Sequence, residues 1–243
     1  MTAPVKARLF VAADLAASLA VDLPADQAHY LRNVLRLAAG DAVALFNGRD
    51  GEFRAAIAQA DKKACRLQVG EQLRPFRASS DLWLCFAPIR QGRIEMIVEK
   101  ATELGAGRLQ PVLTRRSQVT RVNTERLAAH AREAAEQCER LDLPAMAEAI
   151  SLEKLLADWP AGRRLLFCQE RSDAPALLAA VQALPQDVPL GILTGPEGGF
   201  APEEMAAIAR LPQALPVSLG PLILRAETAA IAALAIVQAV RQN

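Results

Sequence analysis

Two apolar runs near the C-terminal end each lead into a glycine-containing loop, and a helical segment follows each loop. The runs are residues 190–193 and 215–219, and the loops read Thr-Gly-Pro-Glu-Gly-Gly-Phe over residues 194–200 and Leu-Gly-Pro-Leu-Ile-Leu-Arg over residues 219–225. Glycine lets the backbone adopt positive φ and approach a ligand closely. Strands of an α/β sheet that end in such loops commonly build a small-molecule site. The pair therefore predicts an α/β fold with a ligand pocket at the strand ends.

The first loop does not fit two common nucleotide-binding patterns. No Lys-Ser/Thr pair follows its last glycine, and its spacing differs from the dinucleotide fingerprint. Glu197 stands at its centre, and a carboxylate suits hydroxyl donors, an amine or a positive centre better than phosphate. These features argue against an ATP-dependent enzyme. The alternative for this loop alone is an exposed turn with proline at one corner.

Composition bounds the class of protein. The 243 residues allow one large or two modest domains, and a hydrophobic content of 52% is ample for a core. No apolar run approaches the roughly 18 residues of a membrane helix, and the N-terminus lacks the long apolar region of a signal peptide. The four cysteines are dispersed without a C-x-x-C pair, and there are two histidines. We therefore expect a cytoplasmic protein without a membrane segment or metal site.

Charge is distributed unevenly along the chain. The net charge is +1, but the first 140 residues carry about +5 and the rest about −4, and 23 of the 28 basic residues are arginine. Arginine pairs with phosphates and stacks on bases, so the bias is compatible with RNA binding. A GC-rich codon bias would enrich the same residue, and the composition alone does not separate the two explanations.

The first part of the chain predicts a small β domain. Strands are expected over residues 7–11, 42–46, 52–58 and 65–69, joined by turn-rich segments, with a helix over residues 25–37. Short strands with tight turns are typical of a barrel-like domain. In the helix, His29, Arg32 and Arg36 share one face, which is either an RNA contact or a solvated basic surface.

The second part predicts a parallel α/β sheet. The periodicity shifts across residues 70–80, and strands are expected over residues 81–87, 108–113 and 164–168 before the two apolar runs. Helices are expected over residues 92–104, 125–139, 152–157, 175–184, 202–210 and 226–240. Strands that alternate with helices in this way are typical of a parallel sheet. The loop over residues 114–121 holds three arginines and no acid, which favours contact with phosphate oxygens over a purely solubilising role.

Several motifs resemble the RsmE family of 16S ribosomal RNA (uridine-N3) methyltransferases, which belongs to the SPOUT superfamily. They are Gly-Pro-Glu-Gly-Gly-Phe at residues 195–200, Leu-Gly-Pro-Leu-Ile-Leu-Arg-Ala-Glu-Thr-Ala at residues 219–229, Lys-Ala-Thr-Glu-Leu-Gly at residues 100–105, and the His29 segment that ends in Gly40-Asp41. The resemblance spans nearly the whole chain. The sequence departs from the family pattern at Leu222, where arginine is usual, and at Ala226, where threonine is common.

The resemblance implies a fold and a set of partners. It implies a PUA-like RNA-binding β-barrel domain over residues 1–74 and a SPOUT α/β domain with a deep trefoil knot over residues 75–243. It also implies S-adenosylmethionine as cofactor, 16S ribosomal RNA within the small ribosomal subunit as partner, and a homodimer. A knot is not visible in sequence periodicity and is rare among folds, so it rests on the resemblance alone.

The resemblance also implies the site residues. Cofactor contacts are expected from Leu193, Thr194, Gly195, Pro196, Glu197, Gly198, Gly199, Leu219, Gly220, Leu224, Thr228 and Ala229. RNA contacts are expected from Arg8, His29, Arg32, Arg36, Arg115, Arg116, Arg121 and Arg140. For Arg140 a structural role is an open alternative, because it lies at the C-terminal end of a helix, where the helix dipole favours a cation.

Catalysis is expected from Arg225 and Glu227, at the entry to the last helix. Methyl transfer is an in-line displacement, and the uracil N3 proton must be lost. We expect Arg225 to stabilise the developing imide anion or a flanking phosphate, and Glu197 or Glu227 to orient a reactant or help remove the proton. Glu227 has an alternative role as a first-turn acid on helix amides. A non-catalytic or differently targeted RNA-binding protein of the same fold is the alternative function.

Overall fold

The computed structural model describes residues 4–61, 64–170 and 173–241, which form two compact units. The first unit comprises residues 1–79 together with Ala135–Leu143, and the second comprises Ser80–Ala134 together with residues 144–243. The expected domains, 1–74 and 75–243, thus divide close to the same place. Their extreme termini, residues 1–3 and 242–243, lie outside the described residues. The return of the chain to the first unit at residue 135 has no counterpart in the sequence-based division.

The first unit contains a five-stranded sheet. Its strands are β1 (Val5–Phe10), β2 (Ala20–Asp22), β3 (Ala42–Phe46), β4 (Glu52–Ala60) and β5 (Cys65–Arg74), in the order β1-β3-β4-β5-β2. β1 pairs with β3 in parallel, and the other pairs are antiparallel. Side chains such as Leu45, Ile57 and Leu67 are at most 1% exposed and form the core of this unit. The four expected strands are confirmed, and the short edge strand β2 was not predicted.

The expected helix over residues 25–37 changes character halfway. α1 (Ala25–His29) runs into a π-helical turn, η1 (Tyr30–Val34), in which the Leu35 amide donates to the Tyr30 carbonyl at 3.0 Å. Arg36 adopts φ +56° and ends the helix. Leu31, which is 1% exposed, lies in the core of the unit. The wider turn therefore ends the helix earlier than its apolar spacing predicts.

Arg8 clamps the returning segment to the sheet of the first unit. Its Nη1 donates to the carbonyls of Ala135 and Glu136 at 3.1 and 2.9 Å, and its Nη2 donates to the carbonyl of Arg140 at 2.8 Å. Its Nε donates to Glu52 at 2.6 Å. Carbonyls at a helix C-terminus lack intrahelical partners, so one guanidinium satisfies several of them at once. This explains why residues 135–143 belong to the first unit.

Glu52 is the acidic residue that binds the Arg8 guanidinium. Its side chain is 6% exposed and accepts from Arg8 at 2.6 Å and from Arg74 at 2.7 Å. Burial alone would raise the pKa of Glu52, but the hydrogen bonds from Arg74 and Arg8 outweigh it and lower the pKa. A lowered carboxyl pKa means that the pair stabilises the fold at neutral pH and loses this contribution as pH falls.

The second unit contains a seven-stranded sheet in which every pair is parallel. The strand order is β12-β10-β11-β6-β7-β8, and β9 pairs with β7. The strands are β6 (Leu82–Phe86), β7 (Arg108–Leu113), β8 (Ala145–Met146), β9 (Ile150–Ser151), β10 (Arg164–Cys168), β11 (Leu190–Thr194) and β12 (Ala214–Val217). The expected parallel α/β architecture is confirmed, and the two-residue strands β8 and β9 were not predicted.

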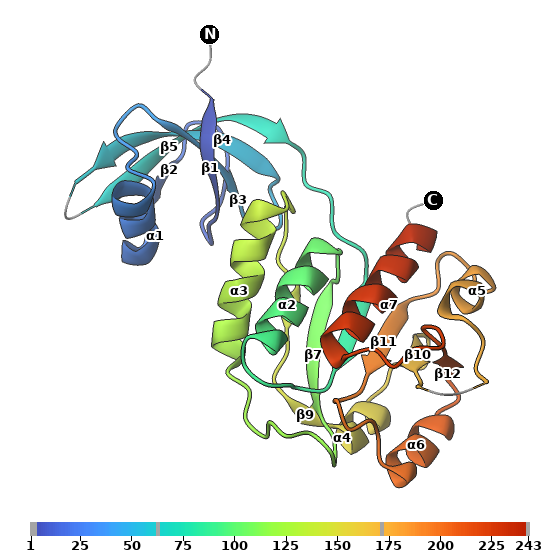
Figure 1. The fold of residues 1–243 in the computed structure, drawn as a ribbon. Coiled ribbons are helices and arrows are strands. Elements are labelled where there is room, and N and C mark those ends of the chain that lie inside the picture. The colour runs from blue at the N-terminus through green and yellow to red at the C-terminus, as the bar shows by residue number, and fades with distance from the viewer. Residues whose placement is uncertain (1–3, 62–63, 171–172, 242–243) are drawn as a thin grey trace. The chain divides into compact units, whose positions relative to one another are not determined.

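Helices cover both faces of this sheet (Figure 1). They are α2 (Arg93–Glu103), α3 (Thr124–Gln137), α4 (Leu152–Ala157), α5 (Leu177–Gln182), α6 (Pro202–Ala209) and α7 (Ala226–Arg241). One face packs on α2, α5, α7 and the first part of α3, and the opposite face packs on α4 and α6. Successive side chains of β10 point to opposite faces of the sheet. Leu166 packs in the core beneath α2, α5 and α7, whereas Leu165 and Phe167 pack in the core beneath α4 and α6, so both faces are apolar.

Small residues let α7 lie close to its neighbours. Ala230 and Ala233 of α7 are fully buried, and α7 packs directly on α2. Gly105, at φ +77°, ends α2, and a Cβ there would lie 2.6 Å from the Nε2 of Gln238 on α7. That Nε2 donates to the Leu104 carbonyl at 2.7 Å, so glycine is required for a polar tie between the two helices.

The Arg8 clamp predicts a pH-dependent stability loss. Arg8→Met is expected to lower the free energy of unfolding by about 3 kcal/mol at neutral pH, because it removes one of the two arginine partners of the buried Glu52 carboxylate and leaves helix-end carbonyls unpaired. The difference from wild type is expected to shrink as pH falls through the lowered pKa of Glu52. Urea unfolding followed by circular dichroism measures both effects.

Arg66→Met is the matched control. Arg66 pairs with Asp22 on the surface of the same sheet, with side chains 53% and 63% exposed, so its loss is expected to change stability little. Equal effects of the two substitutions would contradict the structural role of Arg8.

Candidate functional site

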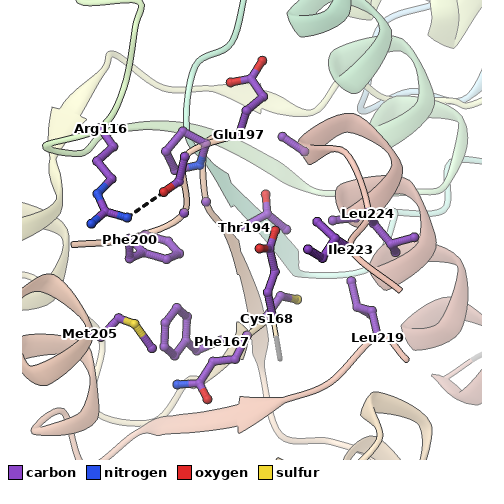
Figure 2. A pocket seen from close by; sticks show the side chains of 18 of the residues that line it. Arg116, Phe167, Cys168, Thr194, Glu197, Phe200, Met205, Leu219, Ile223 and Leu224 are labelled. Atoms are coloured by element: carbon purple, nitrogen blue, oxygen red, sulfur yellow. Dashed lines mark hydrogen bonds between the residues drawn. The ribbon is translucent and has the colours of Figure 1, made fainter. Parts of the chain in front are cut away.

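A pocket of about 390 Å³ opens at the carboxyl ends of β10, β11 and β12, within the second unit. Its volume lies in the range of small-molecule sites. The residues that line it are Arg116, Phe167, Cys168, Gln169, Glu170, Thr194, Gly195, Pro196, Glu197, Gly198, Gly199, Phe200, Met205, Leu219, Gly220, Leu222, Ile223, Leu224, Ala226 and Ala229. Figure 2 shows the side chains that surround this space. The two loops singled out by sequence therefore do meet around one cavity.

The loop after β11 is shaped by its glycines. A Cβ at Gly195 would lie 2.8 Å from the ring of Phe200, which packs edge-on against Phe167 at a centroid distance of 5.1 Å. Gly199 adopts φ +66°, and its amide donates to the Pro196 carbonyl at 2.9 Å. A side chain at Gly195 would displace the ring, and one at Gly199 would strain the turn.

The loop after β12 forms another wall and is the most exposed apolar part of the pocket. Gly220 has φ +116°, and the loop ends where α7 begins. Leu222 and Ile223 are 78% and 55% exposed, whereas Ala226 on α7 is buried and also lines the pocket. The exposed side chain of Leu222 therefore presents hydrocarbon at this side of the pocket.

A buried carboxylate ties a neighbouring loop to the pocket. Glu204 on α6 is 4% exposed, and its two oxygens accept from the amides of Ala201 and Arg115, each at 2.8 Å. The guanidinium of Arg116 then donates to the Gly198 carbonyl at 2.8 Å, as the dashed line in Figure 2 marks. These bonds hold the loop after β7 against the glycine loop after β11.

Charge inside the pocket is sparse. Of the lining residues in the described part of the chain, Arg116, Glu170 and Glu197 carry ionic charge. The Glu197 side chain points away from Thr194 and Cys168 in Figure 2. Burial raises the pKa of the Cys168 thiol to about 12, so this thiol stays protonated at neutral pH. A protonated thiol is a weak nucleophile and would not compete for an electrophilic ligand.

Most of the residues expected to bind the cofactor line the pocket. Ten of the twelve do so, from Thr194 to Gly199 and at Leu219, Gly220, Leu224 and Ala229. Leu193 does not, because its side chain points into the core of the sheet and is fully buried. Thr228 is exposed on α7 and does not line the pocket either.

The structure adds lining residues that were not among the expected cofactor contacts. They are Phe167 to Glu170 at the carboxyl end of β10, together with Arg116, Phe200, Met205, Leu222, Ile223 and Ala226. The change from apolar to polar side chains after Cys168 was the available signal for the first group, since it marks a strand end. That β10 lies between β11 and β12 is a property of strand order and is not written in the sequence.

The two residues expected to be catalytic do not line the pocket. Arg225 is exposed just before α7, and its side chain has no hydrogen bond or ion pair among the described residues. Glu227 is 7% exposed and faces α2, where one oxygen lies 3.6 Å from the Nη1 of Arg93. Its other oxygen, Oε2, is buried without a hydrogen-bond partner among the described residues. Glu227 therefore belongs to the α2–α7 contact.

The residues expected to contact RNA lie in both units and differ in accessibility. In the first unit, His29 and Arg36 are exposed, and Arg32 donates to the carbonyl of Asp61. Arg8 is engaged in the clamp described above, and the side chain of Arg140 is 7% exposed and pairs with Asp142 at 3.0 Å. Arg8 and Arg140 thus have structural partners that account for their positions.

In the second unit, the three loop arginines are exposed but have different surroundings. Arg115 lies 3.5 Å from Glu203, Arg116 belongs to the pocket wall, and Arg121 lines a smaller hollow beside α2 and α3. Of the three, Arg121 is the one without a tie to the pocket loops.

The described residues contain neither a candidate metal site nor a helix that could span a membrane. Within residues 4–61, 64–170 and 173–241, there is no group of three or more histidine, cysteine or acidic side chains placed to hold a metal ion. Among the helices of those same segments, none is long and apolar enough to cross a membrane.

Comparison with known proteins places the chain among RNA methyltransferases. Residues 77–238 match the family described as an RNA methyltransferase domain, and residues 23–70 match the RNA methyltransferase PUA domain. The ribosomal RNA small subunit methyltransferase E of Rickettsia conorii is 35% identical, over 94% of this chain and 93% of that protein. The protein of the same name from Synechocystis is 34% identical, over 97% of this chain and 78% of that protein.

Solved structures agree with these matches. A putative methyltransferase from Legionella pneumophila in complex with S-adenosylmethionine superposes with a TM-score of 0.88 at 28% identity, covering 96% of this chain and 97% of that one. A ribosomal RNA small subunit methyltransferase E from Neisseria gonorrhoeae superposes with a TM-score of 0.86 at 24% identity, covering 96% and 97%, which supports the same fold.

The buried carboxylate predicts a specific loss of order. Glu204→Ala removes the acceptor for two amides and is expected to lower the free energy of unfolding by about 1–3 kcal/mol. It is also expected to raise the hydrogen-exchange rate of the Arg115 and Ala201 amides, because both lose their bonds. Exchange followed by mass spectrometry measures these amides directly.

Glu203→Ala is the matched control on the same helix. Its carboxylate is 65% exposed and meets Arg115 only through the side chain at 3.5 Å, so the Arg115 amide is expected to stay protected. Unchanged protection in Glu204→Ala as well would contradict the proposed tie.

Proposed function

Since the chain belongs to the ribosomal RNA small subunit methyltransferase E family, we propose that it transfers a methyl group from S-adenosylmethionine to N3 of a uridine in 16S ribosomal RNA. It is an S-adenosylmethionine-dependent RNA methyltransferase. The observation that carries the proposal is the pocket in which two glycine loops from parallel strands meet. We propose in addition that the target is a uridine, that the methyl group is added at N3, and that the substrate is the assembled small subunit.

The pocket fits the cofactor in size and surface. Its volume of about 390 Å³ suits a nucleoside with a short side chain. Added Cβ atoms at Gly199 and Gly220 would meet nothing within 4 Å, so bare backbone borders open space there. The walls combine apolar side chains with a few polar groups, as ligand sites usually do. S-adenosylmethionine, when bound, supplies an electrophilic methyl group on a positively charged sulfur.

Positioning is the main contribution that this chain can make to the reaction. The loops after β10, β11 and β12 hold the donor, and the target base must approach their open side. The base must be unpaired to expose N3, as specific RNA recognition generally requires. Because Thr194 is 2% exposed and Glu204 ties the adjoining loop, the pocket is organised before any ligand arrives.

Arg225 is the residue that we propose to act on the acceptor. It is exposed beside the pocket, carries no structural partner in the described chain, and adjoins Leu224 and Ala226, which both line the cavity. A free guanidinium there is available to stabilise negative charge on the uracil ring as the N3 proton leaves, or to hold a flanking phosphate. The group that takes the proton is Glu197 in this proposal, because its exposed carboxylate lies on the pocket rim.

Glu227 acts as a positioning residue in this proposal. Its ion pair with Arg93 at 3.6 Å and its burial hold the first turn of α7 against α2. This turn follows Arg225 directly, so the contact orients the residue that meets the acceptor. Glu227 thus supports Arg225 without reaching the pocket itself.

RNA recognition is proposed for both units separately. In the first unit, which matches a PUA domain, exposed His29 and Arg36 are suited to phosphate or base contacts, and in the second unit Arg115 and Arg121 are suited to phosphates. Arg32, Arg8, Arg116 and Arg140 remain in the predicted set, but their side chains already have protein partners.

The deep trefoil knot, the closed PUA-like barrel, the homodimer and the cytoplasmic location are further parts of the proposal. They are supported by the family to which the chain belongs. Light scattering at micromolar concentration tests the dimer, and a mass of one chain would remove it from the proposal.

Methyl transfer to small ribosomal subunits that lack the modification tests the function. Labelled S-adenosylmethionine is supplied, and the nucleosides of the product are separated and identified. One new N3-methyluridine is the expected result. Donor binding without transfer would point to another RNA, and absent donor binding would contradict the assignment of the pocket and favour a non-catalytic RNA-binding role, consistent with Leu222 at the rim.

Arg225→Ala is expected to reduce the rate of methyl transfer by about 100-fold or more, because one group that stabilises transition-state charge is lost. Affinity for S-adenosylmethionine is expected to remain within about two-fold of wild type, because Arg225 does not line the donor pocket. Single-turnover assays and calorimetric titration measure the two quantities.

Two further variants serve as a control and a comparison for Arg225→Ala. Arg210→Ala removes another exposed arginine from the end of α6 and is expected to leave transfer unchanged. Glu227→Gln is expected to slow transfer less than Arg225→Ala does, as suits a positioning residue. Full activity of Arg225→Ala would remove Arg225 from the mechanism.

A further inference from the structure

The carboxylate of Glu170 has no role in the mechanism above, although it lines the donor pocket. We propose that Glu170 makes the pocket selective for the cationic donor over the neutral product. This rests on the proposed function, since donor and product are S-adenosylmethionine and S-adenosylhomocysteine. The two molecules differ by a methyl group and by the positive charge on sulfur.

Strand order places Glu170 centrally. β10 lies between β11 and β12, and all three strands are parallel, so the residues after β10 emerge between the two glycine loops. The Gln169 amide donates to the Val217 carbonyl at 2.9 Å, which continues the pairing with β12 beyond Cys168. Glu170 follows immediately and is the first exposed residue at this strand end.

The charges of the pocket single out Glu170. Arg116 donates to the Gly198 carbonyl at 2.8 Å on the glycine-loop side, and its positive charge does not favour a cation. The Glu197 side chain points away from Cys168 and Thr194 in Figure 2. The Glu170 carboxylate has no hydrogen bond or ion pair among the described residues, so no described side chain neutralises its charge.

The surroundings make this charge effective. Phe167, Leu219 and Leu224 contribute apolar walls to the same pocket. When a ligand fills such a pocket and displaces water, charges a few ångströms apart interact more strongly than they do in bulk water. The effect depends on charge and needs no particular hydrogen bond. A negative side chain here therefore stabilises the sulfonium form and favours release of the thioether once the methyl group has left.

Calorimetric titration of the purified protein tests the inference with three ligands. They are S-adenosylmethionine, S-adenosylhomocysteine and sinefungin, in which a carbon that carries an ammonium group replaces the methylated sulfur. Wild type is expected to bind both cationic ligands about ten-fold more tightly than the thioether, and Glu170→Gln is expected to lose this preference through weaker binding of the cations alone. Its affinity for the thioether is expected to stay within about two-fold.

Glu203→Gln is the matched control, because it removes a carboxylate from α6 that does not line the pocket. It is expected to keep the ten-fold preference. Equal weakening of all three ligands by Glu170→Gln would overturn the inference and indicate a contact to the shared ribose or amino acid part. An unchanged preference in that variant would overturn it as well. Failure of wild type to bind any of the ligands would instead overturn the proposed function, and this inference with it.

Discussion

The buried carboxylate of Glu204 connects parts of the chain that lie far apart in sequence and together form the pocket. It accepts from the Ala201 amide at the start of its own helix and from the Arg115 amide after β7. With those two amides in place, Arg116 reaches the Gly198 carbonyl. A glycine-rich loop has many conformations available when it is isolated, and fixing it costs entropy. Because folding fixes it here through the buried Glu204 carboxylate and the Arg116 hydrogen bond, a ligand meets a loop that is already ordered.

The arginines divide between folding and function in a way that their number alone conceals. Arg8 donates to backbone carbonyls and to the Glu52 carboxylate. Arg163 likewise donates to a backbone carbonyl and to the Asp81 carboxylate. The planar guanidinium with five donors is suited to this, since it can satisfy several helix-end or strand-end carbonyls at once. Exposed arginines such as Arg121 and Arg225 have no such partners in the described part of the chain. A positive charge in the sequence therefore indicates an RNA contact only where the fold leaves its donors unused.

The sequence predicts the regular helices and strands of this fold well, but it misses the very short strands and the π-helical turn. Continuously apolar strands such as β6 and β11 were expected, because both faces of a parallel sheet are covered. The short strands β2, β8 and β9 carry two or three residues each, too few for a periodic pattern. The π-helical turn at Tyr30 breaks a pattern that otherwise fits a helix, since core packing overrides helical spacing there.

For the candidate site, the sequence by itself determined the two glycine loops, because only glycine tolerates the backbone angle at Gly220 and the close ring contact at Gly195. It also determined that strands lead into those loops. The tertiary structure decided which other residues join them. Strand order brings Glu170 between the loops. The orientation of α7 about its axis directs Glu227 towards Arg93 and away from the cavity. The packing of α6 brings Arg116 to the pocket. These placements depend on contacts between residues far apart in the chain, and local sequence carries no record of such contacts.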